Sequence, residues 1–189
     1  MDYPFKVKHQ TFGDHRGNFC GSPIDMIEDE RLDKKWVQVN TSISIDTFTL
    51  RGLHFQLEPF QQSKYLKVIY GKIINFVLCV DPTRPDYGSV YSFEIDKDHA
   101  VMVPRGFANG LLTLEPNTVI QYFVDNNYKP EYERSILYSS VPQIDVLVNK
   151  YINDPIISDK DAKGIIWEDY QKENLTSYWL FYNHQRQIE

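Results

Sequence analysis

The chain has 189 residues, of which 42% are hydrophobic, and this is enough for one domain spanning residues 1–189 with a buried core rich in Tyr and Phe. Its formal net charge of −6 argues against nucleic acid as a partner, and no window has the length of a membrane span or the pattern of a leader peptide. Cys20 and Cys79 are too few for a disulfide framework or a cysteine metal cluster. We therefore expect a soluble, cytoplasmic protein that binds neither nucleic acid nor membrane.

The N-terminal part alternates polar and apolar residues over 5–11, as a strand does, and then turns through a segment that carries Arg16 and an exposed-looking aromatic, Phe19. An ordinary hairpin loop is the alternative for that segment. The highly charged residues 25–35 predict one short surface helix.

Residues 36–44 alternate strictly, so Gln38, Asn40 and Ser42 share one face of a predicted strand, opposite a row of apolar residues. A polar face of this kind lines a wet pocket or faces bulk water, and the pattern alone leaves both open.

Residues 50–80 form the centre of the prediction, with one strand over 50–56 and β-branched and aromatic residues over 64–80. Gly71 suits a tight turn between two paired strands in that second run. Alternation puts His54 and Gln56 on one face, opposite Leu53 and Phe55. A core histidine with satisfied hydrogen bonds is the alternative to a catalytic one.

Short strands separated by Pro, Gly, Asn and Asp continue to about residue 140 without a clear helical period. The predicted fold class is therefore all-β, an antiparallel jelly-roll barrel with short flanking helices. Beyond Val141 the pattern loosens, with a loop or helix start over 156–164 and an aromatic cluster over 178–182 that should pack on the barrel or on a partner subunit.

The chemical motifs exclude more than they assign. No Gly-x-Ser-x-Gly motif and no Gly-rich phosphate loop is present. Small barrels often hold a metal through a His-x-His pair, but the second position here is Gln56, so we expect no metal and no cofactor. Instead, His54 with a nearby Tyr and Lys suits proton abstraction next to a carbonyl, with the histidine as base and the lysine beside the enolate oxygen.

Several segments resemble one family, the sugar-nucleotide 3,5-epimerases typified by dTDP-4-dehydrorhamnose 3,5-epimerase, which are cofactor-free cupin-fold homodimers. The matching segments, in chain order, read DHRGNF (14–19), QVNTS (38–42), RGLHFQ (51–56), QSK (62–64), PRGFA (104–108), YKPEYE (128–133) and SDKD (158–161). Each is weak alone, but together and in this order they are specific.

The resemblance implies that His54 is the general base, Asp161 its orienting carboxylate, Tyr122 the general acid and Lys64 the cation beside the developing enolate. Without it, Tyr122 reads as a core tyrosine, Asp161 as a helix cap and Lys64 as a strand-edge lysine.

The resemblance also implies a set of residues that contact the nucleotide diphosphate or the sugar. Arg51 would hold the diphosphate by charge-assisted hydrogen bonds, and Arg16 and Phe19 would reach the nucleotide of the neighbouring subunit. The predicted substrate-binding residues are Arg51, Gln38, Asn40, Gln56, Asn109, Tyr128, Arg16 and Phe19.

The chain departs from the family pattern at three places. Asn109 stands where the family has a histidine, Gly21 where it commonly has a glutamate, and residues 138–140 where it tends to have Trp-Asn-Asp. These departures predict a divergent member whose nucleotide is dTDP or GDP and whose sugar is a hexose or heptose of capsule or lipopolysaccharide.

The predicted activity is inversion of C3, and of C5 if both centres are processed, in a nucleotide-linked 4-keto-6-deoxy sugar. A 3,4-ketoisomerase of the same barrel fold and a catalytically silent sugar-nucleotide-binding barrel are the alternatives.

Overall fold

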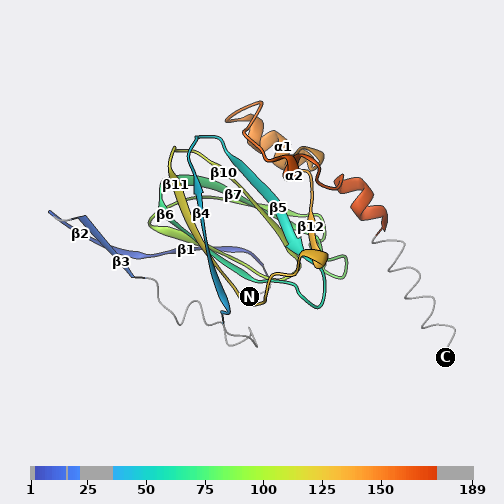
Figure 1. The fold of residues 1–189 in the computed structure, drawn as a ribbon, viewed down its shortest axis with the longest axis horizontal. Helices are drawn as coiled ribbons and strands as arrows, with labels where there is room; N and C mark the ends of the chain where they lie inside the picture. Colours follow the sequence, from blue (N-terminus) through green and yellow to red (C-terminus); the bar gives the residue numbers. More distant parts are fainter. Residues whose placement is uncertain (1–2, 16, 22–35, 174–189) are drawn as a thin grey trace.

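The computed structural model describes residues 3–15, 17–21 and 36–173, and within them two five-stranded antiparallel sheets face each other (Figure 1). The first sheet has the order β1-β9-β6-β11-β4, with strands Phe5–Lys8, His99–Val103, Lys64–Tyr70, Thr118–Val124 and Gln38–Ser44. The second has the order β12-β5-β10-β7-β8, with strands Glu133–Ser135, Leu50–Gln56, Phe107–Thr113, Lys72–Cys79 and Val90–Asp96.

A two-stranded hairpin, β2 (Gln10–Asp14) and β3 (Gly17–Gly21), lies outside both sheets. Figure 1 shows it projecting from one side of the barrel, while the helices α1 (Pro142–Asn149) and α2 (Asp159–Ala162) lie on the other side. Two short 3-10 turns, η1 (Pro130–Tyr132) and η2 (Tyr138–Ser140), lead into this helical part.

The interior between the sheets holds one apolar cluster, with side chains such as Leu66, Val68 and Ile120 from the first sheet and Val77 and Phe107 from the second. Strict alternation in β10 and β7 sends every second residue into this interior, and the intervening residues point outward.

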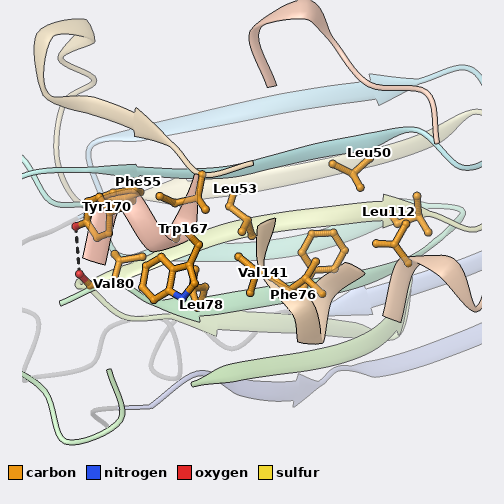
Figure 2. Packing of buried hydrophobic residues seen from close by; sticks show 14 of the residues in the cluster. Leu50, Leu53, Phe55, Phe76, Leu78, Val80, Leu112, Val141, Trp167 and Tyr170 are labelled. Atoms are coloured by element: carbon orange, nitrogen blue, oxygen red, sulfur yellow. Dashed lines mark hydrogen bonds between the residues drawn. The ribbon is translucent and has the colours of Figure 1, made fainter. Parts of the chain in front are cut away.

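The outer face of the second sheet is also apolar, and the C-terminal part of the chain covers it. Leu53, Phe55 and Phe76 pack there against Val141 and Trp167 (Figure 2). The hydroxyl of Tyr170 donates a hydrogen bond to the carbonyl oxygen of Val80 at 3.2 Å. Because this sheet is buried on both faces, its outer layer fixes the strands whose inner faces carry the candidate site.

One strand prediction needs correction, and one helix was not predicted. Gly71 does connect two strands and has a positive φ of 86°, but β6 and β7 are not paired, because they belong to different sheets. A Cβ at residue 71 would collide with Thr118 of β11, so this tight crossing between the sheets needs glycine. The helix α1 was also missed, since its Ile and Val residues gave no clear helical signal.

Helix α2 confirms the predicted helix start within 156–164. The predicted helix over 25–35, the aromatic cluster over 178–182 and Arg16 lie outside the described residues. Among the helices that the structure describes, none is both long and apolar enough to cross a membrane.

Candidate active site

Strand β5 carries the centre of the site, and a bulge at Gly52 determines which of its side chains face the interior. His54 pairs with Asn109 of β10, but the register then shifts, so that Arg51 pairs with Leu111. Strict alternation would place Arg51 and His54 on opposite faces, because they are three residues apart. The bulge puts both on the inner face, while Leu50 and Leu53 join the outer cluster.

Only glycine fits at this bulge. Gly52 has a φ of 107°, and a Cβ there would lie 2.6 Å from the carbonyl oxygen of Asn109 and 2.6 Å from Cα of Gly110. The contact atoms belong to the backbone of β10, so they cannot move aside as a flexible side chain would. The glycine of the RGLHFQ segment is therefore required by the close approach of two strands.

His54 is paired with Asp161, as the resemblance implied. Nε2 of His54 lies 2.7 Å from Oδ1 of Asp161, whose other oxygen accepts a hydrogen bond from the backbone N–H of Gly52 at 3.1 Å. Asp161 is 4% exposed and lies in α2, where the Ser158 hydroxyl caps the helix by accepting from the Asp161 N–H. Burial acts to raise the pKa of Asp161, but the hydrogen bond with His54 prevails and lowers it.

The bond to Asp161 also selects the tautomer of a neutral His54. A carboxylate only accepts hydrogen bonds, so Nε2 must carry the proton and Nδ1 is left with its lone pair. The His54 side chain is 30% exposed, which leaves the ring accessible on one side. It has the arrangement of a general base held by a carboxylate.

Lys64 reaches from the first sheet to the second. Its Nζ donates to the carbonyl oxygen of His54 at 3.2 Å, and burial lowers its pKa to about 8 against the opposing effect of Glu133. The preceding residue is fixed firmly, because the N–H of Ser63 donates to the buried Asp125 at 2.7 Å. The lysine therefore supplies an ammonium group inside the barrel, close to His54.

Tyr122 lies on β11 of the facing sheet, paired with Asn40 of β4 and Leu66 of β6. It is partly buried and packs against the interior cluster. Burial raises the pKa of its phenol above the ordinary value, although the positive charge of Arg51 acts in the opposite direction. The hydroxyl stays protonated near neutral pH, as a general acid requires.

Arg51 crosses to the first sheet in the opposite direction from Lys64. Its guanidinium donates to the Ser44 hydroxyl at 3.0 Å and to the carbonyl oxygen of Ile43 at 3.0 Å. On the same edge strand β4, Nε2 of Gln38 donates to Oδ1 of Asn40 at 2.6 Å. Asn40, on the polar face of β4, is the residue that pairs with Tyr122 of β11.

Comparison with known proteins identifies the family of this chain. The family described as dTDP-4-dehydrorhamnose 3,5-epimerase matches residues 3–169. An enzyme of that name from Sinorhizobium fredii is 33% identical over 168 residues, which cover 82% of this chain and 80% of the relative. The chain therefore belongs to this epimerase family.

Two solved structures of such epimerases have the same fold. The one from Bacillus anthracis, with TDP and PPi bound, has a TM-score of 0.75 at 28% identity and covers 86% of this chain and 93% of its own. The one from Legionella pneumophila, in complex with dTDP-4-keto-L-rhamnose, has a TM-score of 0.73 at 28% identity, with 87% of each chain covered. The prediction of an all-β jelly-roll barrel of the cupin type is confirmed, and the epimerase is an isomerase.

Gln56, one of the predicted substrate-binding residues, has its side-chain amide bonded to loop backbone. Gln56 is 5% exposed, and its amide is used by loop backbone: Nε2 donates to the carbonyl oxygens of Phe60 and Asn127, and Oε1 accepts from the N–H of Lys129. Gln56 therefore joins the loops after β5 and β11. Alternation places Gln56 on the same face as His54, but it could not reveal that the Gln56 amide bonds to the backbone of these loops.

Two further predicted substrate-binding residues, Tyr128 and Phe19, are exposed. Tyr128 is 47% exposed and donates through its hydroxyl to Glu133 at 2.7 Å. Phe19 lies in β3 and is 71% exposed. Neither residue is joined to His54 or Tyr122 by a hydrogen bond.

Sequence reasoning missed Glu133, which lies on β12 next to β5. Its carboxylate accepts from Tyr128 and from Lys160 at 2.6 Å. Burial acts to raise the pKa of Glu133, but these hydrogen bonds prevail and lower it. The only signal in the sequence was the position of this glutamate at the end of the YKPEYE segment. In the structure, its negative charge acts to raise the pKa of both Lys64 and Tyr122.

A cavity of about 390 Å³ is lined by Gln56 but not by the proposed catalytic residues. Its walls include Phe55, Gln62, Asp81 and Tyr170, and neither His54 nor Tyr122 lines it. In the described part of the chain, no group of three or more His, Cys, Asp or Glu residues is arranged to hold a metal ion.

Proposed function

We propose that this epimerase inverts C3 of a nucleotide-linked 4-keto-6-deoxy sugar, and C5 as well if a second proton is exchanged, by acid–base chemistry through an enolate. The observation that carries the proposal is the 2.7 Å bond between His54 and Asp161, which leaves Nδ1 of His54 as an unprotonated base inside the barrel.

The reaction would run in two proton transfers. Nδ1 of His54 removes the proton from the carbon next to the C4 carbonyl and later releases it to solvent. The electron pair of that C–H bond forms the carbon–carbon double bond of the enolate, and the π pair of the carbonyl moves onto its oxygen. The Lys64 ammonium stabilises this negative charge. The Tyr122 hydroxyl then donates its proton to the opposite face of the carbon, which restores the carbonyl with inverted configuration, and solvent reprotonates the phenolate.

The nucleotide diphosphate would bind at Arg51, which lies on the inner face of β5, is exposed, and donates to the carbonyl oxygen of Ile43 on β4. The named relatives act on dTDP sugars, so dTDP is the first candidate, with GDP and a heptose as the alternatives that the departures at Gly21 and Asn109 suggest. Thermal unfolding with dTDP or GDP separates them, because a ligand that binds only the native state raises the Tm.

A homodimer is also part of the proposal. Apolar residues of the edge strand β4 and its flanks face outward, where Val39 is 50%, Ile43 61% and Ile45 71% exposed. An apolar sheet face next to an open edge favours an interface, and the projecting β2–β3 hairpin extends beyond the barrel on its own. Light scattering on the purified protein measures the mass. Location in the cytoplasm and a role in surface polysaccharide synthesis stay predictions.

The test of the activity is incubation in D2O with the 4-keto-6-deoxy sugar linked to whichever nucleotide, dTDP or GDP, raises the Tm, followed by NMR. Deuterium at C3 alone identifies a single-centre epimerase, and deuterium at C3 and C5 identifies a double one. Absence of deuterium at both carbons contradicts the proposal. The variant His54→Asn is the control, since it should keep ligand affinity and lose exchange.

A further inference from the structure

Two asparagine side chains meet on the inner face of the second sheet, next to His54. Asn75 of β7 is fully buried, and its Nδ2 donates to Oδ1 of Asn109 at 2.8 Å and to the carbonyl oxygen of Gly110 at 2.8 Å. Asn109 is partly buried and pairs directly with His54 across β10 and β5. This amide pair forms the wall of the barrel beside the proposed base.

The backbone fixes the direction of both amides. The carbonyl oxygen of Gly110 can only accept, so Asn75 must turn its NH2 group toward β10. The second proton of that NH2 group then requires the oxygen of Asn109, which turns the Asn109 NH2 group away from Asn75. Among the described residues, none accepts a hydrogen bond from the Asn109 NH2 group, so its two N–H bonds are available to a ligand.

Nearby polar atoms lack partners in the same way. Oδ1 of Asn75, the hydroxyl of Ser135 and the hydroxyl of Ser42 are buried and have no partner among the described residues. Ser135 pairs with His54 across β12 and β5, and Ser42 pairs with Ile120, two residues from Tyr122. Buried polar groups are almost always hydrogen-bonded, so unpaired ones on strands that pair with His54 or lie next to Tyr122 indicate that a polar ligand or its waters supply the partners.

We propose that Asn109 determines substrate specificity by donating a hydrogen bond from its NH2 group to an oxygen of the sugar, and that Asn75 is a positioning residue which sets this orientation. The inference rests on the proposed function and specifies which part of the substrate meets this wall. An amide neither gains nor loses a proton in the physiological pH range, so the wall binds a keto or hydroxyl oxygen without taking part in proton transfer.

The test compares the affinities of dTDP and dTDP-6-deoxyglucose by calorimetry, since the second ligand has no C4 carbonyl and cannot react. Their ratio measures the contribution of the sugar alone. Asn109→Leu keeps the shape of the side chain and removes the donor, so the ratio should fall roughly three- to tenfold while dTDP affinity is unchanged. Asn149→Leu, on the exposed end of α1, is the matched control and should leave the ratio unaltered.

Asn75→Leu tests the positioning role by a double-mutant cycle. It should lower the ratio in the wild-type background and have little further effect when Asn109 is already Leu, because Asn75 acts through Asn109. An equal effect in both backgrounds indicates a merely structural role and overturns that part. Asn75→Ser takes its place if the Leu variant does not fold.

The outcomes separate this inference from the proposed activity. A wild-type ratio near one, or a ratio unchanged in Asn109→Leu, overturns the amide contact whether or not the protein exchanges deuterium. If the wild-type protein binds the sugar through Asn109 but incorporates no deuterium, the amide contact is supported and the proposed epimerase reaction is contradicted.

Discussion

Nε2 of His54 donates to Oδ1 of Asp161 at 2.7 Å, although the two residues lie 107 positions apart in the chain. The same carboxylate accepts from the N–H of Gly52, so one buried side chain holds both the bulge and the base that the bulge turns inward. The orientation of His54 and the path of β5 are therefore coupled through Asp161.

The coupling predicts the effect of Asp161→Asn. The Asn amide can accept from Gly52 through its oxygen, but it then offers an NH2 group to His54, and Nε2 must become the acceptor. The proton of the neutral ring moves to Nδ1, which can no longer act as base. Deuterium exchange should fall by about 10²- to 10⁴-fold. Asp159→Asn, in the same short helix, serves as the control, and a rate within threefold of wild type in Asp161→Asn contradicts the assignment of the base.

Tyr122→Phe should separate exchange from inversion. The ring still packs in the interior cluster, but no hydroxyl remains to protonate the enolate from the second face. His54 can still remove and return a proton on its own side, so the substrate should incorporate deuterium while inversion slows roughly 100-fold. NMR detects both in one sample. Equal loss of exchange and inversion would count against Tyr122 as the acid, and Tyr70→Phe, on an exposed outer face, should change neither.

The pKa of Lys64, lowered by burial to about 8, predicts an alkaline limit of activity. Below pH 8 the ammonium is charged and stabilises the enolate, and as pH rises through about 8 the charge is lost and kcat/KM should fall. The Tyr122 pKa is raised above its usual value near 10, so the phenol does not titrate in this range.

The variant Lys64→Arg tests this assignment, because guanidinium keeps its charge throughout the alkaline range. Its pH profile should lack the fall near pH 8, whatever its absolute rate. A fall at the same pH in Lys64→Arg shows that another group is responsible.

Gly52→Ala should destabilise the fold more than Gly88→Ala, a substitution at a glycine that also has a positive φ. A methyl group at residue 52 would meet the backbone of β10 at 2.6 Å in addition to the cost of a positive φ. We expect a loss of about 3 kcal/mol or more in the free energy of unfolding. Gly88→Ala, with a φ of 80° and a nearest contact of 3.7 Å, is the control and should cost about 1–2 kcal/mol. Urea denaturation measures the free energy of unfolding of both variants. Equal decreases would show that the close approach of β10 to Gly52 does not contribute to stability.

Most strands could be predicted because alternation is a local property. Residues 36–44 alternate in sequence and contain β4 (Gln38–Ser44), where each inner residue pairs with an inner residue of β11. The motif segments gave the site residues only through the resemblance, since Lys64 and Asp161 have no local pattern that distinguishes them from surface residues.

Local patterns are insufficient where a distant contact overrides them. Alternation around residue 52 would separate Arg51 from His54, but the approach of β10 inserts a bulge. The turn at Gly71 was read as a hairpin, because a glycine between two apolar runs looks the same whether the strands pair or part. Gln56 follows the strand pattern, yet the loops at 60 and 127–129 take up its amide.

The amino-acid sequence by itself determined the strand content, the aromatic core and, through its ordered motifs, the family to which the chain belongs. The tertiary structure alone decided which atoms of Asp161 and His54 meet, that Lys64 and Arg51 cross between the sheets in opposite directions, and that two amides line the wall beside the base. The physical reason is that side-chain period and turn chemistry act between neighbours in the chain, whereas hydrogen bonds and burial depend on which strands the whole fold brings together.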